Sequence, residues 1–478
     1  MITLEEAQRA TEGRWVRCPL PPATPLRGGA FDTRTLGGAE MFFALTGENG
    51  DGHRYLADLA GSSVRLAVVE READCGGFEG AVLRVGNTRT ALAALARSLV
   101  DRYRPWVVAV TGSFGKTTAK ETIAHVLAGG RPVLKTRGSF NNEIGVPLSL
   151  LDLDGSQDTA VLEFAARHPG DIDLLGSIAP PDVALLLNVG RAHVAVFGSL
   201  EETYRAKGEI FNHLRPGGLA IVGAEDPRLR EMAPGGRTLT IGRERGDFHA
   251  EEIVVDDRGR QRFIAVHGET RLAMRAGFPG PHAVYPLLAA WAIAREGGLP
   301  DETVAERAAA DPALQGRAQS LTAPGGATIV DDSYNASPET VLNLIETLAS
   351  IAAERRVLVL GHLSELEEGL AESVREIGRG LRPPLDELWV HDPERPETAG
   401  QFQAVAQGVT VRDLPELPEL IAALHAADRP GVAIGIKGGR AAHMERAVHG
   451  LLGGAVECRL ATCGLLMHCT DCEALTKP

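Results

Sequence analysis

The stretch Thr111-Gly-Ser-Phe-Gly-Lys-Thr-Thr118 has residue types and a spacing that suit phosphate binding. Gly112 and Gly115 carry no Cβ, so the backbone there can approach phosphate oxygens closely. Exposed N–H groups and a following helix N-terminus would add partial positive charge. Lys116 can reach terminal phosphates, and the Thr117 hydroxyl can bind Mg²⁺. We therefore predict an ATP site with Mg²⁺ that includes Gly112, Ser113, Gly115, Lys116, Thr117 and Thr118.

The spacing of this loop is shorter than the common G-x-x-x-x-G-K-[ST] pattern, because position 110 is Val rather than Gly. The alternative interpretation is a glycine-rich turn with an exposed lysine. We disfavour it because a strand-like run, the loop, the lysine, two threonines and a helical pattern coincide. GTPases share this type of loop, but the sequence contains no Asn-Lys-x-Asp guanine motif.

The loop needs a strand before it and a helix after it, and the sequence predicts both. Residues 106–110 form a continuous apolar run, which is typical of a buried parallel strand. Ile123, Val126 and Leu127 share one face of a predicted helix that ends at Gly129-Gly130. Similar apolar runs, separated by helical stretches, occur at residues 160–162, 183–187, 219–222, 327–330, 357–360, 388–390 and 432–436. This alternation predicts an α/β fold with parallel sheets.

The 478 residues suggest about three domains. We place a first domain at residues 1–104, with a strand at 41–45 and a closing helix at 88–103. A central domain follows at residues 105–315 and a second, Rossmann-like α/β domain at 316–454. Residues 455–478 form a cysteine-rich tail. In such sheets, ligands bind beyond the carboxyl ends of the strands.

The composition limits the class of partner. The net charge of −14 opposes a general nucleic-acid binder, because such binding depends on clustered Lys and Arg. No apolar run approaches the roughly 18 residues that a membrane-spanning helix needs, and no secretory signal is visible. We expect a cytoplasmic monomer that binds small molecules, neither nucleic acid nor a membrane.

Several ordered motifs between about residues 25 and 450 resemble those of the Mur ligases of bacterial cell-wall synthesis. Besides the short phosphate loop, residues 141–147 are similar to the family's N-N-x-I-G-x-P segment, and residues 316–317 to its P-x-G-R segment. Residues 331–338 are close to D-D-S-Y-N-A-N-P, and residues 437–445 resemble K-G-S-R-x-x-x-M-E. The resemblance implies an N-terminal domain that binds a UDP-sugar, a central ATPase-like parallel sheet and a C-terminal Rossmann-like ligase domain.

Within the family, the motifs are most similar to those of members that join D-alanyl-D-alanine to UDP-N-acetylmuramoyl-tripeptide. The resemblance implies the same ATP-dependent amide ligation through an acyl phosphate. It implies that Glu163 binds Mg²⁺, that His193 lies near a second Mg²⁺, and that Lys207 is carbamylated to bind that metal. From the residues alone, Glu163 could instead face solvent, and Lys207 could be a helix-surface lysine paired with a nearby glutamate.

The same resemblance implies the remaining binding residues. Asn142, His282, Arg317 and Asp332 are expected beside the nucleotide, with Arg317 at the phosphates and Asp332 facing the ribose. The expected substrate-binding residues are Asp32, Thr33, Arg34, Tyr334, Asn335, Lys437 and Arg440. The first three would hold the UDP-sugar, although Asp-Thr-Arg is also an ordinary turn sequence.

Three segments depart from the family pattern. Residues 163–168 read Glu-Phe-Ala-Ala-Arg-His where E-L-G-A/M-N/S is usual, close to the incoming amine. Ala283 and Pro286 stand where the family has two asparagines, of which the second contacts adenine. His362 replaces an aspartate. Two alternatives therefore stay open: a related ligase for another acid and amine, and a degenerate nucleotide-binding homologue.

The tail carries Cys458, Cys463, Cys469 and Cys472, with His468 directly before Cys469. These soft ligands could bind Zn²⁺, although the spacing differs from the usual paired C-x₂-C pattern. The alternative is that the cysteines are small apolar residues that pack a terminal helix around residues 465–467. A reducing cytosol disfavours structural disulfides.

Overall fold

The computed structural model describes residues 1–47, 50–72, 74–190, 197–310, 312, 314–363, 370–464 and 468–476. The chain forms two compact units. The first unit comprises Met1–Ile241 with Ala292–Leu299, and the second comprises Gly242–Trp291 with Pro300–Pro478. The division falls within helix α9 (Val284–Glu296).

The phosphate loop belongs to a six-stranded sheet in the first unit, in which all neighbouring strands are parallel. The strands, in spatial order, are β11 (Val133–Lys135), β12 (Thr159–Glu163), β10 (Trp106–Thr111), β13 (Val183–Leu186), β14 (Leu219–Gly223) and β15 (Thr238–Ile241). The chain leaves β10 toward β11 and β12 and then returns to its other side for β13. The strand order therefore reverses at β10, which is where open α/β sheets bind ligands.

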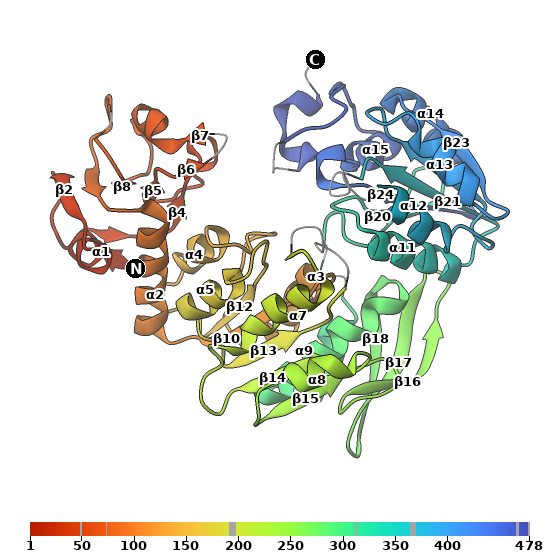
Figure 1. Ribbon diagram of the computed structural model, residues 1–478, viewed down its shortest axis with the longest axis horizontal. Helices are drawn as coiled ribbons and strands as arrows, with labels where there is room; N and C mark the ends of the chain where they lie inside the picture. The colour runs from red at the N-terminus through yellow and green to blue at the C-terminus, as the bar shows by residue number, and fades with distance from the viewer. Residues whose placement is uncertain are drawn as a thin grey trace. The chain divides into compact units, whose positions relative to one another are not determined.

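Helices connect these strands, as parallel crossovers require. They are α3 (Lys116–Leu127), α4 (Gly145–Leu150), α5 (Asp171–Ile178), α7 (Leu200–Gly208) and α8 (Pro227–Met232). Figure 1 shows them around the sheet. Strands β12 and β13 are buried throughout, and β10 is buried except at Trp106, which explains their continuous apolar sequences.

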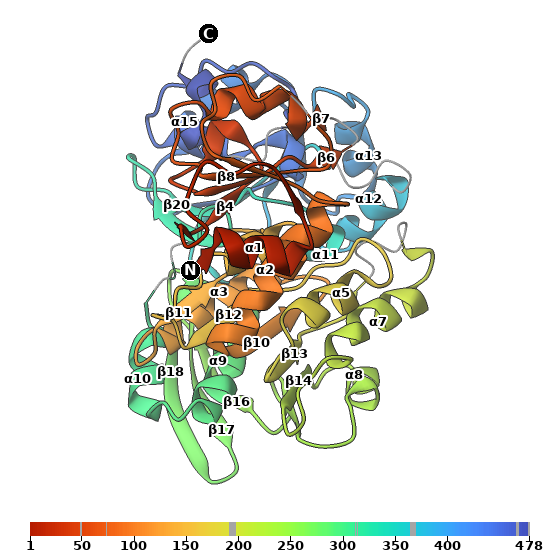
Figure 2. The same ribbon diagram turned by 90° about the vertical axis from the view of Figure 1, so that its left-hand side faces the viewer.

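The N-terminal part of the first unit contains a five-stranded sheet and two helices. The strands are β2 (Arg14–Arg17), β9 (Ala81–Arg84), β8 (Leu66–Val69), β5 (Met41–Phe43) and β4 (Gly29–Ala30). Helix α1 (Leu4–Thr11) packs against α2 (Thr88–Tyr103), as Figure 1 and Figure 2 show. Asn87 caps α2, because its side-chain oxygen accepts a hydrogen bond from the Thr90 N–H at 2.9 Å.

The second unit contains another six-stranded sheet. In spatial order its strands are β19 (Gln319–Thr322), β20 (Thr328–Asp332), β24 (Val432–Lys437), β21 (Arg355–Gly361), β22 (Glu387–His391) and β23 (Thr410–Asp413). Only β19, at the edge, is antiparallel to its neighbour. The helices of this part are α11 (Pro338–Ser350), α12 (Leu370–Gly378), α13 (Thr398–Val405), α14 (Leu417–Ala427) and α15 (Glu445–Leu451).

A separate antiparallel sheet begins the second unit. Its strands are β16 (His249–Val255), β17 (Arg260–His267) and β18 (Thr270–Pro279), and α10 (Asp301–Ala308) packs against β18. No helix among the described residues is both long and apolar enough to cross a membrane.

The predicted α/β class and the predicted apolar strands are confirmed. Each apolar run named above lies in or largely overlaps a strand, and the predicted closing helix corresponds to α2. The edge strands β11, β15, β19 and β23 and the antiparallel β16–β18 sheet were not predicted from the sequence. These strands are partly exposed and mix polar with apolar residues, so they lack the continuous apolar signal of central strands.

Candidate active site

The phosphate loop connects β10 to α3, as predicted. Gly115 lies at the N-terminus of α3 with a φ of 76°, a left-handed conformation that favours glycine. The Lys116 Nζ donates hydrogen bonds to the carbonyl oxygens of Gly112 and Ser113, both at 2.9 Å. The lysine therefore folds back over its own loop.

Asn188 holds the loop in shape, and the sequence analysis missed it. Its Oδ1 accepts hydrogen bonds from the N–H groups of Ser113 at 3.0 Å and Phe114 at 3.1 Å. Its Nδ2 donates to the Phe114 carbonyl at 3.1 Å. Asn188 follows β13, which is parallel to β10, so both loops leave the same edge of the sheet. A polar residue just after a buried strand was the available signal.

Glu163 ends β12 beside the loop. Parallel pairing aligns it with Val110, one residue before the end of β10. Its Oε2 accepts a hydrogen bond from the Thr117 hydroxyl at 2.7 Å, and its Oε1 accepts one from the Asn141 amide at 2.7 Å. The residue is only 1% exposed. A buried carboxylate facing a hydroxyl offers the hard oxygen ligands that Mg²⁺ prefers.

The two asparagines of the 141–147 segment have different surroundings. The Asn141 side chain reaches Glu163, whereas the Asn142 Oδ1 accepts hydrogen bonds from the backbone N–H groups of Ile144 at 3.3 Å and Gly145 at 2.9 Å. The side-chain oxygen of Asn142 is thus engaged at the start of α4, and Asn141 is the member next to the predicted metal ligand.

Lys207 is buried on α7, with 1% exposure, rather than placed on a helix surface. Burial, reinforced by the nearby charge of Lys116, lowers the pKa of Lys207 to about 7, while Glu163 opposes this shift. Its Nζ lies 5.8 Å from the centroid of the Phe197 ring. A substantial fraction of this amine is therefore uncharged near neutral pH. His193, the other predicted metal neighbour, lies outside the described residues.

In the second unit, Asp332 and Lys437 come together at the carboxyl ends of two paired strands. The register of β20 and β24 aligns the two residues, and their side chains form an ion pair. The Asp332 Oδ1 also accepts a hydrogen bond from the Ala318 N–H at 3.2 Å. Lys437 is 2% exposed, so this pair is held within the structure rather than on a solvated surface.

Other predicted residues of this unit lie around the ring of Tyr334. The guanidinium carbons of Arg317 and Arg440 lie 4.0 and 5.0 Å from the centroid of its ring. The Asn335 Oδ1 accepts a hydrogen bond from the Arg440 N–H at 3.2 Å. Five predicted residues therefore lie in one neighbourhood: Arg317, Asp332, Tyr334, Asn335 and Arg440.

His282 lies in the 3₁₀ turn that leads into α9, with its Nε2 at 3.4 Å from the Glu346 Oε2. Its ring stacks on that of Tyr285 with centroids 6.3 Å apart. Pro286 is the third residue of α9, in the first turn, where a missing N–H removes no hydrogen bond within the helix. The departure at position 286 is therefore compatible with the fold.

Asp32 and Arg34 contact each other in the N-terminal domain. The Asp32 Oδ1 caps a turn by accepting the Arg34 N–H at 3.0 Å, and the Arg34 Nη2 lies 2.7 Å from the Asp32 Oδ2. Hydrogen bonding from Arg34 holds the pKa of Asp32 below its usual value. The Arg34 side chain is 74% exposed. Asp32 therefore caps a turn, as Asp-Thr-Arg commonly does, while the Arg34 guanidinium stays accessible to a ligand.

Two of the departures from the family pattern have clear structural roles. The Arg167 and His168 N–H groups both donate to the Asp171 Oδ2 at 2.8 Å, at the start of α5. His362 is buried, and its Nδ1 lies 2.7 Å from the Asp392 Oδ1. Both segments are therefore ordered by local polar contacts.

The cysteines of the tail are all free thiols. Among the described residues, one group of side chains could bind a metal ion, and it contains a single cysteine of the tail. Cys469 lies beside His443 and Glu445, which precede the tail. Burial and the nearby Glu445 raise the pKa of the Cys469 thiol to about 12. Sequence reasoning missed His443 and Glu445 because they are more than 20 residues away from Cys469 along the chain.

Comparison with known proteins defines the class. Residues 110–294 match the Mur ligase middle domain, and residues 316–440 match the Mur ligase glutamate ligase domain. The chain belongs to the Mur ligase family.

Particular relatives are more specific. The chain is 33% identical to the UDP-N-acetylmuramoyl-tripeptide–D-alanyl-D-alanine ligase of Mycobacterium tuberculosis, with 86% of this chain and 89% of that protein covered. It is similar to a crystal structure of MurF from Acinetobacter baumannii, with a TM-score of 0.84, 31% identity and coverage of 95% and 99%. MurF of Thermotoga maritima in complex with ADP gives a TM-score of 0.78 at 29% identity, with coverage of 90% and 97%.

Proposed function

We propose that this protein is an ATP-dependent amide ligase of peptidoglycan precursor synthesis that joins D-alanyl-D-alanine to UDP-N-acetylmuramoyl-tripeptide. The observation that carries the proposal is the convergence of Lys116, Thr117 and Glu163 at one edge of the parallel sheet, with the Thr117 hydroxyl 2.7 Å from Glu163. The relatives of this name, similar over most of their length, support the choice of substrates.

Thr117 and Glu163 would hold Mg²⁺ between the loop and the nucleotide phosphates. A bound Mg²⁺ supplies positive charge that neutralises phosphate oxygens and fixes their orientation. The site fits this ion because it pairs a buried carboxylate with a hydroxyl and has no sulfur ligand. Lys116, released from the carbonyls of its own loop, would donate to the terminal phosphates.

Two substitution steps complete the reaction. An oxygen of the tripeptide carboxylate attacks the γ-phosphorus of ATP, the bond to the β,γ-bridging oxygen breaks, and ADP leaves an acyl phosphate. The amine of the dipeptide then attacks the acyl carbon, the bond to the phosphate oxygen breaks, and the nitrogen loses a proton. The ammonium of Lys116 stabilises the charge that develops on the transferring group.

Lys207 is proposed to react with CO₂ as a neutral amine, forming a carbamate and releasing a proton. Its burial and lowered pKa favour the uncharged form that this addition needs. The resulting anion would replace a cation that otherwise lies near Lys116. With His193, it would provide ligands for a second Mg²⁺.

We further propose that Arg317, Asp332 and His282 contribute to nucleotide binding. Tyr334, Asn335, Lys437 and Arg440 are proposed to bind the peptide substrates, and Asp32, Thr33 and Arg34 to bind the UDP-sugar. The contacts of Arg317 and Arg440 with Tyr334, and of Arg440 with Asn335, support placing these four residues together. The three proposed domains, 1–104, 105–315 and 316–454, carry these roles in a cytoplasmic monomer that binds neither nucleic acid nor a membrane.

One assay separates this function from its alternatives. The protein is incubated with ATP, Mg²⁺, UDP-N-acetylmuramoyl-tripeptide and D-alanyl-D-alanine, and phosphate release and product mass are measured. We expect release of phosphate with the mass of the amide product. Product only with another acid or amine would point to a related ligase, and no turnover with any pair to a degenerate homologue.

A further inference from the structure

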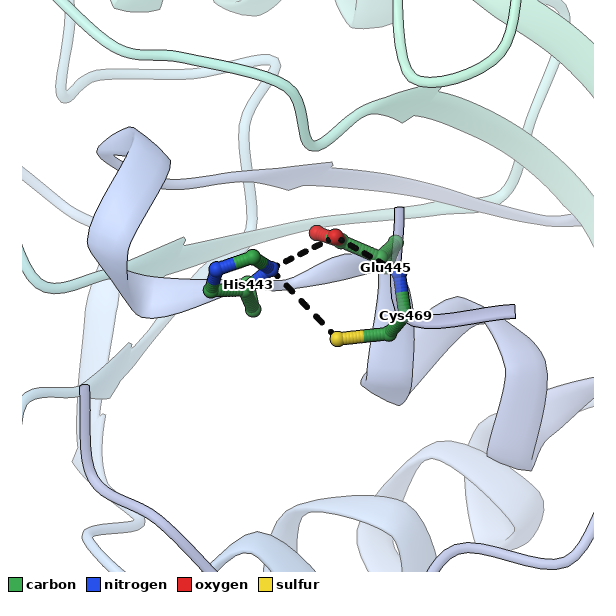
Figure 3. A group of neighbouring side chains, drawn as sticks. All are labelled: His443, Glu445 and Cys469. Atoms are coloured by element: carbon green, nitrogen blue, oxygen red, sulfur yellow. Dashed lines mark hydrogen bonds and ion pairs between the residues drawn. The ribbon is translucent and has the colours of Figure 1, made fainter. Parts of the chain in front are cut away.

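A cluster of three potential metal ligands lies where the C-terminal segment meets the end of the second unit. His443, Glu445 and Cys469 place one ligand atom each within 4.8 Å of one another (Figure 3). The His443 Nδ1 is 2.8 Å from the Glu445 Oε1 and 3.4 Å from the Cys469 Sγ. Glu445 belongs to the 437–445 segment that resembles a family motif, whereas Cys469 lies beyond residues 316–440, which match the family domain.

The hydrogen bond made by Nε2 of His443 leaves Nδ1 as the ring nitrogen that could bind a metal ion. The His443 Nε2 is 3.1 Å from the carbonyl oxygen of Cys463, which can only accept a hydrogen bond. Nε2 therefore carries a proton, and in the neutral ring Nδ1 presents a lone pair toward the Glu445 carboxylate. Nδ1 is thus the ring nitrogen that lies beside both other potential ligand atoms, the Glu445 Oε1 and the Cys469 Sγ. Metal-binding histidines commonly donate their other N–H to a backbone carbonyl in this way.

Glu445 supplies a second, independent observation. The residue is 2% exposed, yet its Oε2 has no hydrogen-bond partner among the described residues. Its Oε1 is 3.2 Å from the Arg440 Nη1 and accepts the Cys469 N–H at 3.3 Å. Leaving a buried carboxylate oxygen without a partner is costly, and a bound cation would satisfy it.

The backbone at His443 is also fixed in an uncommon conformation. Its φ is 47°, in the left-handed region that side-chain-bearing residues rarely adopt. This conformation ends the 3₁₀ turn Arg440–Ala442 and precedes the helix that carries Glu445. It places the ring beside the carboxylate two residues later. Strain of this kind is usually found where a side chain must hold a particular position.

We propose that His443, Glu445 and Cys469 bind one Zn²⁺ ion that fastens the C-terminal segment to the substrate-binding turn around Arg440. A thiolate, an imidazole and a carboxylate together favour zinc over Mg²⁺, which prefers oxygen ligands alone. A water molecule would complete the four-coordinate shell that zinc prefers. This proposal keeps Cys469 from the four-cysteine prediction and takes the other two protein ligands from His443 and Glu445.

The proposed ion has a defined connection to the ligase site. Arg440 contacts Glu445 through its side chain, Tyr334 through its guanidinium and Asn335 through its backbone N–H. A bound cation would neutralise part of the Glu445 charge and so weaken its ion pair with Arg440. The zinc would thus be structural, and its role in substrate binding rests on the proposed function, whereas its presence does not.

The test is metal analysis of the full chain, purified with a non-chelating reductant and dialysed against metal-free buffer after zinc addition. We expect stoichiometric zinc in the unaltered protein. Replacing zinc with Co²⁺ should give a sulfur-to-cobalt charge-transfer absorption and the intense visible bands of a tetrahedral site. Both readouts are independent of ligase activity, so failure of the proposed function would leave them unchanged.

Matched variants identify the ligands. Cys469→Ser and His443→Gln should each weaken zinc binding by about 100-fold or more and abolish the cobalt spectrum. Cys463→Ser should retain both, because its backbone carbonyl, which accepts from His443, is kept, and its thiol is not a member of the ligand cluster among the described residues. Circular dichroism and thermal unfolding verify that each variant is folded. Absence of zinc from the unaltered protein, retention in both ligand variants, or loss in Cys463→Ser with retention in Cys469→Ser would each overturn the proposal.

Discussion

Glu163 is the residue whose chemistry is most completely defined by its surroundings. Its two oxygens accept hydrogen bonds from Thr117 and Asn141, and the side chain is almost fully buried. In such a poorly solvated environment the carboxylate interacts with a nearby positive charge more strongly than it would in water. The identity of the ligand atoms, rather than the volume of the side chain, should therefore decide activity.

The first prediction replaces Glu163 with Gln, which keeps the shape and removes the charge. We expect kcat to fall by about 100-fold or more, because charge stabilisation of the transferring phosphoryl group is lost. The melting temperature should change little, since Gln can still accept from Thr117. Steady-state phosphate release measures the effect, with Glu201→Gln, at an exposed position of α7, as the control. Unaltered kcat in Glu163→Gln would remove Glu163 from the mechanism.

Lys207 leads to a prediction about pH and CO₂. With a pKa of about 7, the neutral fraction of the amine rises from about one tenth at pH 6 to about nine tenths at pH 8. We expect ligase activity at low CO₂ to rise over this range and to increase with added bicarbonate, most strongly near pH 6–7. Initial rates with and without bicarbonate provide the measurement.

The control for this experiment is Lys207→Arg, which keeps a positive charge and cannot form the carbamate. It should be nearly inactive and insensitive to bicarbonate. The lowered pKa of Lys207 also makes the free energy of unfolding depend on pH. In the unfolded chain the lysine keeps its proton up to about pH 10.5, whereas in the folded protein it releases the proton near pH 7. This group therefore makes stability increase with pH between those values. An active, bicarbonate-independent Lys207→Arg enzyme would contradict carbamylation.

At the scale of elements, the loop after β13 supports the loop after β10. Asn188 accepts from two N–H groups of the phosphate loop and donates to one carbonyl, so a single side chain fixes three backbone groups. The parallel pairing of the two strands brings these loops to one edge. The shape of the anion-binding loop thus depends on a neighbouring strand as well as on its own glycines.

A third prediction tests this support with two substitutions of Asn188. Asn188→Ala should raise the dissociation constant for ATP by about tenfold, since two loop N–H groups lose their acceptor, a cost of roughly 1–2 kcal/mol. Asn188→Asp retains an acceptor but adds a negative charge next to the phosphates, so it should bind ATP more weakly still. Titration calorimetry with ATP and Mg²⁺ measures both. Equal affinity in all three proteins would show that the loop holds its shape without Asn188.

The parts of this fold that could be predicted from the sequence are those with a local signal. Central strands such as β10 and β24 are continuous apolar runs, and the loop at residues 111–118 carries its function in its own residues. Edge strands such as β23 are half solvated and have no such run. Asn188 and His443 gain their roles from partners distant in the chain, Ser113 and Cys469, and a single sequence does not show those distances.

At the scale of the whole molecule, the chain extends beyond the matched family domains into a segment that packs on the second unit. Leu475 is 3% exposed, and the Glu457 N–H donates to its carbonyl at 2.7 Å. Arg446 of α15 is 2% exposed, and its Nη1 donates to the Leu460 carbonyl at 2.7 Å. The segment is therefore a partner of α15 rather than an appended tail.

The fourth prediction removes residues 455–478. Truncation would expose Arg446, remove the buried Leu475 and break the hydrogen bond from Arg446 to the Leu460 carbonyl. We expect the second unit to lose about 2–4 kcal/mol of unfolding free energy, from one buried leucine and one or two hydrogen bonds to a charged group. Urea unfolding followed by tryptophan fluorescence measures the change, because Trp389 is buried in this unit.

The comparison should be made on chelator-treated proteins, so that any loss of metal binding does not enter the difference. Arg446→Met in the full chain is the matched variant. It removes the hydrogen bonds of the guanidinium but leaves the segment in place, so it should account for only part of the loss. If the truncated protein unfolds at the same urea concentration as the full chain, the packing of Leu475 and Arg446 contributes nothing to stability. An intermediate midpoint for Arg446→Met would instead separate the polar anchoring of the segment from its apolar burial.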